Sequence, residues 1–275
     1  MSIVPLAGVI GCPVGHSRSP VLHGTWLRNY GIKGHYVPLH VESGDLARVL
    51  RTLPAMGFVG ANVTIPHKEA ALALADTVTP VARAIGAANT LTFSDGQIQA
   101  DNTDGYGFLR NLREGAPKWQ PSGGPALVLG AGGAARAVIV ALADAGVRQI
   151  WLSNRTLARA KILQAEIAAP ITVIDWADWT RVAQDAALLV NTTSLGMVGQ
   201  PELALGTDTF NPRMVVTDLV YTPLDTALLR QARGSGCVTV DGLGMLLHQA
   251  APGFKRWFGH KPKVTEALRA AVLGA

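Results

Sequence analysis

Short runs of apolar residues alternate with longer segments of helical periodicity along almost the whole chain. This alternation is typical of βαβ units, in which helices connect and cover the strands of a parallel sheet. In the N-terminal part, the apolar runs predict strands at Leu6–Val14, His35–Val41 and Gly60–Ile65, and the helical spacing predicts helices at Pro20–Tyr30, at Asp45–Met56 and from about His67. Two further runs, Asn89–Phe93 and Gln97–Ala100, predict a hairpin because Ser94-Asp95-Gly96 supplies Asp-Gly turn chemistry between them.

A second series of alternating patterns begins after residues 115–125, which are the richest in Pro and Gly and are typical of a linker. Its apolar runs predict strands at Ala126–Leu129, Gln149–Ser153, Ile171–Ile174, Ala187–Asn191, Met214–Asp218 and Cys237–Asp241. Helical patterns at Leu243–Phe258 and Lys263–Leu273 follow. The pattern therefore predicts an α/β protein, and its 275 residues suit about two domains.

Composition narrows the class of protein. With 48% hydrophobic and 16% charged residues, the chain can build a substantial core. The N-terminus lacks the basic start of a signal peptide, and Arg136 and Asp144 interrupt the most apolar stretch, so we expect a cytoplasmic protein without membrane contact. The net charge of +5 comes from scattered basic residues, which argues against nucleic-acid binding and is typical of an ordinary basic surface. In the alternative, functional interpretation, the excess positive charge helps to attract small anionic ligands. The two cysteines, Cys12 and Cys237, indicate neither a disulfide framework nor a metal-ligand spacing, so no metal is expected.

Residues 125–139 predict a buried strand, a glycine turn and a helix. Gly130, Gly132 and Ala135 fill the G-x-G-x-x-G/A pattern in that context. Gly130 permits the tight turn, Gly132 lets the backbone approach a pyrophosphate, and Ala135 keeps the helix close to the sheet. Because a helix N-terminus also offers free N–H groups, the segment predicts a dinucleotide site rather than a simple connection.

The next predicted strand ends in Asn154-Arg155-Thr156, where an NAD enzyme would carry an acidic residue for the ribose. Arg155 and Arg159 are instead four residues apart at a predicted helix start, so their side chains can project on one side. Guanidinium groups match phosphate geometry, and the pair therefore favours NADP over NAD.

Lys68 follows a predicted strand and Pro66, which places it at the start of a helix. A lysine beside the positive end of a helix gives up its proton more readily, as a general base requires. The alternative is an ordinary solvated lysine.

Asp104 belongs to the segment Asp101-Asn-Thr-Asp-Gly105, which precedes a predicted helix at Tyr106–Arg113. In a functional interpretation, its carboxylate faces Lys68 and orients the ammonium group. In the alternative, Asp101 or Thr103 caps the helix and Asp104 complements the helix dipole. The sequence leaves both open.

Ser17 and Ser19 precede the first helix, in which Pro20 suits position N1 and Ser19 the N-cap. Capping does not explain Ser17. Residues two apart in an extended segment face the same way, so the two hydroxyls could together receive a carboxylate.

The order of these motifs resembles that of the shikimate dehydrogenase family over essentially the full chain. The matching series is Gly15-His-Ser-Arg-Ser-Pro20, Asn62-Val-Thr-Ile-Pro-His-Lys68, Gly86-Ala-Ala-Asn-Thr90, Asp101-Asn-Thr-Asp-Gly105, Gly130-Ala-Gly-Gly-Ala-Ala135, Asn154-Arg-Thr156, Asn191-Thr-Thr-Ser194, Asp218-Leu-Val-Tyr-Thr-Pro223 and Gly242-Leu-Gly-Met-Leu-Leu-His-Gln249. The glycine loop occurs in many oxidoreductases, whereas the lysine and Asp-Asn-Thr-Asp-Gly segments in this order are specific. Thr222 and Leu219 depart from the family, which often has Asn and Met there.

The resemblance implies an N-terminal α/β substrate domain with a mostly parallel sheet (1–106), against which residues 245–275 pack, and a Rossmann NADP-binding domain (107–244). It also implies that the substrate lies between the domains. The implied activity is the reversible, NADPH-dependent reduction of 3-dehydroshikimate to shikimate, in chorismate and aromatic amino acid biosynthesis. Monomer and homodimer remain open.

The resemblance also implies a role for each matching residue. Lys68 and Asp104 are the catalytic pair. The substrate-binding residues are Ser17 and Ser19 for the carboxylate, and Thr64, Asn89, Gln249 and the nearby Tyr221 for the ring hydroxyls. The cofactor-binding residues are Gly130, Ala131, Gly132, Gly133, Ala134, Ala135, Asn154, Arg155, Thr156, Arg159, Thr192, Gly242 and Met245.

Three rival functions are weighed against this interpretation. The quinate/shikimate branch often uses NAD and tends to have Thr at the second serine position, where this chain has Ser19. Methylene-tetrahydrofolate dehydrogenase shares the architecture but not the serine and Asp-Asn-Thr-Asp-Gly segments. A non-catalytic NADP sensor would have no need of Lys68 and Asp104.

Overall fold

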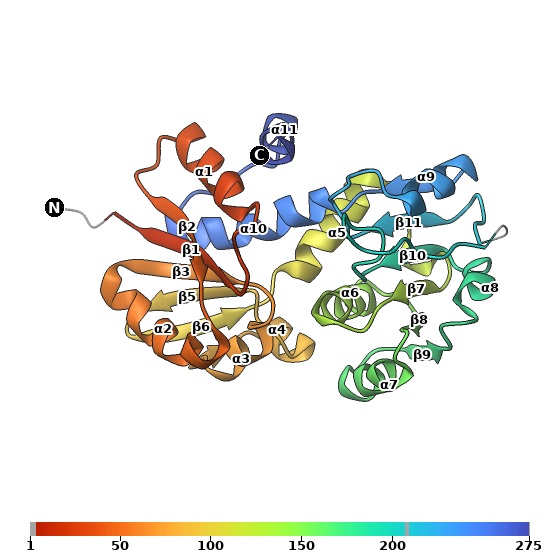
Figure 1. Ribbon diagram of the computed structural model, residues 1–275, viewed down its shortest axis with the longest axis horizontal. Helices are drawn as coiled ribbons and strands as arrows, with labels where there is room; N and C mark the ends of the chain where they lie inside the picture. The colour runs from red at the N-terminus through yellow and green to blue at the C-terminus, as the bar shows by residue number, and fades with distance from the viewer. Residues whose placement is uncertain (1–3, 207–208, 275) are drawn as a thin grey trace. The chain divides into compact units, whose positions relative to one another are not determined.

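The structure is a computed structural model that describes residues 4–206 and 209–274 (Figure 1). The chain divides into two compact units. Unit 1 combines the N-terminal segment up to Thr103 with the C-terminal segment from Leu247, and unit 2 spans Asp104–Leu246. In the part of the chain that is described, no helix is both long and apolar enough to cross a membrane.

Unit 1 is built on a mixed sheet. Among its described residues, six strands lie in the order β2-β1-β3-β5-β6-β4. Figure 1 labels β1, β2, β3, β5 and β6. The strands are β1 (Leu6–Gly11), β2 (His35–His40), β3 (Phe58–Val63), β4 (Thr77–Val78), β5 (Thr90–Ser94) and β6 (Gln97–Asp101). β1 pairs in parallel with β2 and β3, and β4 with β6, whereas β5 is antiparallel to β3 and β6. Parallel pairs therefore outnumber antiparallel ones, as the sequence predicted.

The predicted hairpin is formed by β5 and β6. Asp95 and Gly96 at its tip have φ values of 51° and 74°. Two consecutive residues with positive φ are the signature of the type I′ turn, for which Asp-Gly is a preferred sequence. The strand pairing that the turn predicted is confirmed.

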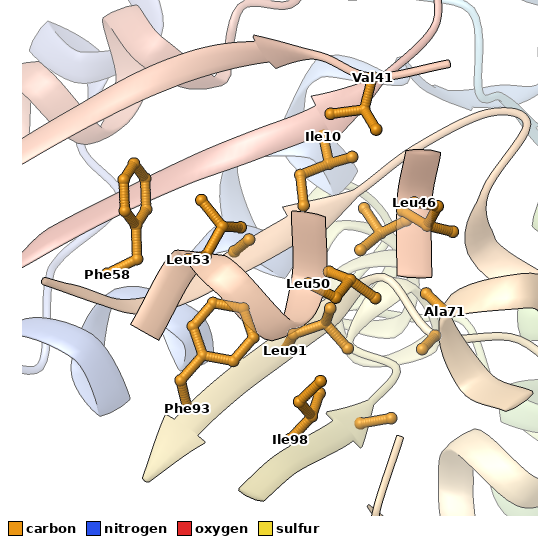
Figure 2. Packing of buried hydrophobic residues seen from close by; sticks show 14 residues of the cluster. Ile10, Val41, Leu46, Leu50, Leu53, Phe58, Ala71, Leu91, Phe93 and Ile98 are labelled. Atoms are coloured by element: carbon orange, nitrogen blue, oxygen red, sulfur yellow. The ribbon is translucent and has the colours of Figure 1, made fainter. Parts of the chain in front are cut away.

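Helices cover the sheet of unit 1. They are α1 (Ser19–Asn29), α2 (Leu46–Thr52), α3 (Lys68–Ala73), α4 (Pro80–Ile85), the portion of α10 (Leu243–Phe258) from Leu247 onward, and α11 (Glu266–Leu273). Figure 2 shows α2 packing against the sheet, where Leu50, Ile10 and Leu91 are completely buried. This core fixes the ends of β1 and β3, from which the candidate site residues follow.

Unit 2 has a sheet in which every described pair of strands is parallel. Its order is β12-β11-β10-β7-β8-β9. The strands are β7 (Ala126–Leu129), β8 (Ile150–Ser153), β9 (Ile171–Ile174), β10 (Leu188–Asn191), β11 (Val215–Asp218) and β12 (Val238–Val240). The helices are α5 (Asp104–Gly115), α6 (Gly133–Asp144), α7 (Leu157–Glu166), α8 (Trp179–Ala183) and α9 (Ala227–Gly234). This is the Rossmann order, whose topological switch point lies between β7 and β10.

The structure corrects several predicted boundaries. The first strand ends at Gly11 rather than Val14, and the predicted helix at Asp45–Met56 is an α-helix flanked by 3₁₀ turns. Proline explains the 3₁₀ turn at the C-terminal end of α2, because Pro54 has no N–H to continue the hydrogen-bonding pattern of the helix. The last helix begins at Glu266, where the Thr265 hydroxyl accepts a hydrogen bond from the N–H of Leu268, rather than at Lys263. The short elements β4 and α4 were not predicted.

Candidate active site

The serine segment is a turn that leads into α1. Ser17 N–H donates to the carbonyl of Val14 over 3.0 Å, and Arg18 has helical backbone angles, so the segment is not extended as predicted. Ser19 is not the N-cap either, because α1 begins at Ser19 itself. The Ser17 hydroxyl accepts a hydrogen bond from the N–H of Ser19 at 3.3 Å, so Ser17 performs the local capping that was expected of Ser19.

Lys68 is the first residue of α3, as predicted. The turn before it is fixed from two sides. His67 N–H donates to the Thr64 carbonyl over 3.0 Å, and the buried His67 ring nitrogen Nε2 lies 2.7 Å from the Val41 carbonyl. The carbonyl of Lys68 accepts the N–H of Ala88 at 2.9 Å. The backbone of Lys68 therefore starts from a rigid position, and its side chain is half-buried.

Asn89 is the centre of a buried hydrogen-bond cluster. Its Oδ1 accepts bonds from the N–H of Thr103 at 2.9 Å, from the Thr103 hydroxyl at 3.1 Å and from the Thr90 hydroxyl at 2.8 Å. Its Nδ2 donates to Gln249 Oε1 at 3.2 Å. Because the N–H of Thr103 can only donate, the oxygen of the Asn89 amide must face it, and the orientation of the amide is fixed. The structure thus brings together Asn89 and Gln249, which lie 160 positions apart.

The cluster continues through Asn62 to Tyr36, neither of which was predicted as a site residue. Asn62 Nδ2 donates to the Asn89 carbonyl at 3.1 Å, and Asn62 Oδ1 accepts the Tyr36 hydroxyl at 2.7 Å. Burial raises the pKa of Tyr36 well above its ordinary value, and a hydrogen bond with Ser19 acts in the opposite direction. Tyr36 stays neutral, and a chain of polar side chains therefore links Ser19 to Gln249.

His23 supports this chain from α1. Its ring stacks on Tyr36, with 3.9 Å between ring centroids and 2° between planes. Complete burial lowers the pKa of His23 to about 3, so the imidazole is neutral at physiological pH. We interpret His23 as a packing residue that fixes the tyrosine ring.

Asp101 and Asp104 have different surroundings. The Asp101 carboxylate accepts bonds from Thr79 at 2.7 Å, from Arg256, and from the N–H of Asn102 at 2.8 Å. Burial alone would raise the pKa of Asp101, but the hydrogen bonds from Thr79 and Arg256 outweigh it and hold that pKa below its usual range. Both Asp101 and Thr103 bond within unit 1. Thr103 also directly precedes α5, at the N-cap position, so the alternative in which one of them caps this helix stays open.

Asp104 is the first residue of α5, which begins two residues before the predicted Tyr106. It is 7% exposed and belongs to unit 2, whereas Lys68 belongs to unit 1. A carboxylate in the first turn also complements the helix dipole, as the alternative interpretation of Asp104 stated. The pairing of Asp104 with Lys68 stays a prediction.

The glycine loop lies at the switch point of unit 2. Gly130 follows β7 with φ of +105°, and a Cβ there would lie 2.6 Å from Thr192 Oγ1, so only glycine fits. The Thr192 hydroxyl donates to the Leu129 carbonyl over 2.6 Å, which joins the ends of β7 and β10. A Cβ at Gly132 or Gly133 would meet nothing within 4 Å.

This loop fits a dinucleotide. The open space beside Gly132 and Gly133 lies at the start of the twelve-residue helix α6, of which Gly133 is the first residue, and the first N–H groups of a helix lack partners within it. Ala135 is completely buried, consistent with its predicted role of keeping α6 close to the sheet. Ala131 and Ala134 are half-buried beside the loop.

The predicted adenosine end follows β8. Asn154 Nδ2 donates to the Thr156 carbonyl at 2.9 Å, which closes a small turn. Arg155 lies in this turn and Arg159 in the first turn of α7, and both side chains are exposed. No acidic residue follows β8 directly, so the two arginines leave positive charge at the position where a ribose 2′-phosphate would lie.

The remaining predicted residues lie near the end of β11 and the start of α10. Gly242 packs against the backbone, since a Cβ would lie 2.3 Å from the Leu219 carbonyl oxygen. Met245 and Tyr221 are half-buried. Asp218 was not predicted as a site residue, yet its carboxylate accepts bonds from Asn191 at 2.9 Å, from Thr226 at 2.7 Å and from the N–H of Val220 at 3.0 Å. Burial raises the pKa of Asp218 to about 6.

Three family profiles match the chain. The one described as the shikimate dehydrogenase substrate binding domain matches residues 9–91, and the one described as shikimate/quinate 5-dehydrogenase matches residues 118–209. The shikimate 5′-dehydrogenase C-terminal domain matches residues 242–273.

Similar proteins carry related names. The shikimate dehydrogenase (NADP⁺) of Roseobacter denitrificans is 64% identical over 275 residues, which cover 100% of this chain and 99% of the relative. That of Paracoccus denitrificans is 60% identical over 98% of this chain and 96% of its own.

Solved structures are similar over nearly the whole chain as well. Quinate dehydrogenase from Corynebacterium glutamicum in complex with NAD has a TM-score of 0.92 at 31% identity, and covers 99% of both chains. Shikimate 5-dehydrogenase from Thermus thermophilus in complex with NADP(H) and shikimate has a TM-score of 0.87 at 38% identity, over 98% of this chain and 99% of that one.

Proposed function

The chain belongs to the shikimate dehydrogenase family, and we propose that it catalyses the reversible reduction of 3-dehydroshikimate to shikimate with NADPH, in chorismate and aromatic amino acid biosynthesis. The observation that carries the proposal is the 64% identity with an NADP-dependent shikimate dehydrogenase over the full chain. The proposal is also supported by residues suited to each part of the reaction: Lys68 to proton transfer, Asn89 to the substrate and the glycine loop to the cofactor.

Unit 2 would hold the cofactor, which when bound supplies the hydride. The N–H groups at the start of α6 and the open space at Gly132 and Gly133 suit the pyrophosphate. Arg155 and Arg159 suit the 2′-phosphate, because their exposed guanidinium groups carry the charge that such a group needs. Thr192, Gly242 and Met245 would border the cofactor from β10 and α10.

Unit 1 would bind the substrate. Ser17 and Ser19 are assigned to the carboxylate, and Thr64, Asn89 and Gln249 to the ring hydroxyls, with Tyr221 of unit 2 nearby. The fixed orientation of the Asn89 amide supports this assignment, since an amide that is held before the substrate arrives loses little entropy on binding. Hydroxyl recognition by such buried groups is specific, because a ligand without the hydroxyl leaves them unpaired.

Lys68 is assigned the proton transfer. In reduction, the Lys68 ammonium gives its proton to the alkoxide that forms at the former ketone carbon, and in oxidation the neutral amine takes the proton from that hydroxyl. Asp104 would orient the ammonium and bind the reacting hydroxyl. The rigid backbone of Lys68 at the start of α3 supports this assignment.

Quinate oxidation with NAD is the competing function, because a quinate dehydrogenase bound to NAD has a TM-score of 0.92 to this chain. Quinate has an additional hydroxyl beside its carboxylate, so Ser19 in place of the threonine common in that branch favours shikimate. Initial rates of shikimate and quinate oxidation, each with NADP and NAD, test the proposal. We expect kcat/KM to be highest for shikimate with NADP. Faster turnover of quinate with NAD, or no turnover of either acid despite NADP binding, would contradict it.

We also propose that the enzyme works in the cytoplasm as a monomer or a homodimer. Both cysteines are free thiols, which is typical of a reducing compartment. Light scattering after size-exclusion chromatography measures the molecular mass in solution, and a mass above twice 28.9 kDa would contradict both oligomeric states.

A further inference from the structure

Three side chains with metal-binding atoms converge at one edge of the sheet in unit 1. Cys12 follows β1 directly, His40 is the last residue of β2, and Glu42 lies two residues beyond. β1 and β2 are parallel neighbours with Gly11 opposite His40, so both strands end at the same edge (Figure 1). We propose that Cys12, His40 and Glu42 bind one Zn²⁺ ion.

The distances between the three groups suit a tetrahedral ion. Cys12 Sγ lies 3.6 Å from His40 Nε2 and 3.5 Å from Glu42 Oε2, and His40 Nε2 lies 3.1 Å from Glu42 Oε1. Zinc bonds of about 2.3 Å to sulfur and about 2.1 Å to nitrogen or oxygen, at tetrahedral angles, place sulfur about 3.6 Å from the other ligands and nitrogen about 3.4 Å from oxygen. Sulfur and nitrogen therefore already stand at the separation of two corners of the coordination polyhedron, and each lies close to a different oxygen of the Glu42 carboxylate, one of which would take the third corner.

The strand geometry explains why the ligands meet. Residues two apart in extended chain face the same side, which places His40 and Glu42 together. Parallel pairing then brings the end of β1, and with it Cys12, alongside. The His40 and Glu42 side chains are 55% and 70% exposed, so an ion can enter from solvent, and water can fill the fourth position.

The donor set selects the class of metal. Thiolate, imidazole and carboxylate together suit zinc, whereas Ca²⁺ and Mg²⁺ take oxygen ligands only. Without an ion, the Cys12 thiol donates to Glu42. Zinc binding replaces that proton, which leaves to solvent, and the thiolate becomes the ligand.

The cluster was missed in the sequence because its ligands follow two different strands. Cys12 and His40 are 28 positions apart, a separation without a recognised metal-ligand spacing. In the structure, one potential ligand atom from each of Cys12, His40 and Glu42 lies within 4.8 Å of the other two. None of the three was assigned to substrate, cofactor or proton transfer, so the site is independent of the proposed enzymatic function.

Metal titration of the untagged, full-length protein tests the proposal. After treatment with a chelator and its removal, Zn²⁺ is titrated in competition with a chromophoric chelator, and Co²⁺ is added separately as a spectroscopic probe. We expect one equivalent of Zn²⁺ to bind, and Co²⁺ to give a thiolate charge-transfer absorption in the near ultraviolet. Cys12→Ser should abolish that absorption. Cys12→Ser, His40→Asn and Glu42→Gln should each weaken Zn²⁺ binding at least about tenfold, because the loss of even an outer-shell partner of a ligand costs about 10- to 100-fold in affinity.

Two matched variants serve as controls. His35→Asn removes an exposed histidine at the other end of β2, and Cys237→Ser removes the second free thiol. Both should keep the stoichiometry and the cobalt absorption. Thermal unfolding of each zinc-free variant shows whether it folds, and Glu42→Gln, at an exposed position, remains informative should Cys12→Ser not fold. Absence of saturable Zn²⁺ binding, or cobalt absorption that persists in Cys12→Ser, would overturn the proposal.

Discussion

The substrate side of unit 1 and the cofactor side of unit 2 are constructed differently. In unit 1, Asn89, Asn62 and Gln249 are buried and bonded to one another, so the structure holds the polar side chains in place. In unit 2, the glycine loop offers backbone N–H groups and open space, and Arg155 and Arg159 are exposed. Under the proposed function, specificity for the substrate would come from preorganised side chains, whereas the cofactor would be bound by backbone and by surface charge.

The largest expected effect belongs to Lys68→Ala. Loss of the general acid–base group should lower kcat by about 10²–10⁴-fold with a smaller change in KM. Steady-state kinetics with shikimate and NADP measure both. Lys118→Ala, at an exposed position outside both sides of the site, is the control. A change in KM with normal kcat would show that Lys68 only binds.

Arg155→Ala tests the cofactor side of unit 2. Charge-assisted hydrogen bonds contribute about 1.5–3 kcal/mol, so NADPH binding should weaken about 10- to 150-fold while NADH binding stays the same. Fluorescence titration of both cofactors measures this, with the exposed Arg148→Ala as control. Equal losses for NADPH and NADH would mean that Arg155 does not contact the 2′-phosphate.

Asn89→Ala tests whether the hydrogen-bond cluster of unit 1 holds its side chains in place. The change removes the acceptor of three hydrogen bonds and leaves buried donors unpaired, so we expect a loss of about 1–3 kcal/mol in unfolding free energy. KM for shikimate should rise as well. Denaturant unfolding and steady-state kinetics measure the two effects.

Thr92→Val is the matched control for Asn89→Ala and carries the smallest expected effect. The Thr92 hydroxyl is buried and, among the described residues, has no hydrogen-bond partner. Replacing it with a methyl group of similar shape removes no hydrogen bond and relieves the cost of burying an unpaired hydroxyl, so the unfolding free energy should not fall. A loss as large as that of Asn89→Ala would mean that packing, rather than the hydrogen-bond cluster, stabilises this region.

The same contrast explains which features could be predicted from sequence. The strands of unit 2 and the glycine loop are local patterns, and the structure confirms the strands at Ala126–Leu129 and Ile171–Ile174 at their predicted bounds. The shikimate dehydrogenase family and its α/β fold are also confirmed.

The sequence could not predict contacts between distant segments. Tyr36 on β2 and Asn62 on β3 meet although β1 lies between these two strands, and a single polar residue in an apolar run carries no spacing signal. The contacts of Asp218 with Asn191 and of Cys12 with His40 also join residues that are far apart in the sequence, so no local pattern predicts them. The serine segment was predicted wrongly because a turn at Val14–Ser17 replaced the assumed extended backbone.

The most direct test of the comparison is a crossed binding measurement. Dissociation constants for shikimate and for NADPH are determined by titration for the unmodified protein, for Asn89→Ala and for Arg155→Ala. We expect Asn89→Ala to weaken shikimate binding alone and Arg155→Ala to weaken NADPH binding alone. If each variant weakened both ligands to the same extent, substrate and cofactor recognition would not be divided between the two units as described.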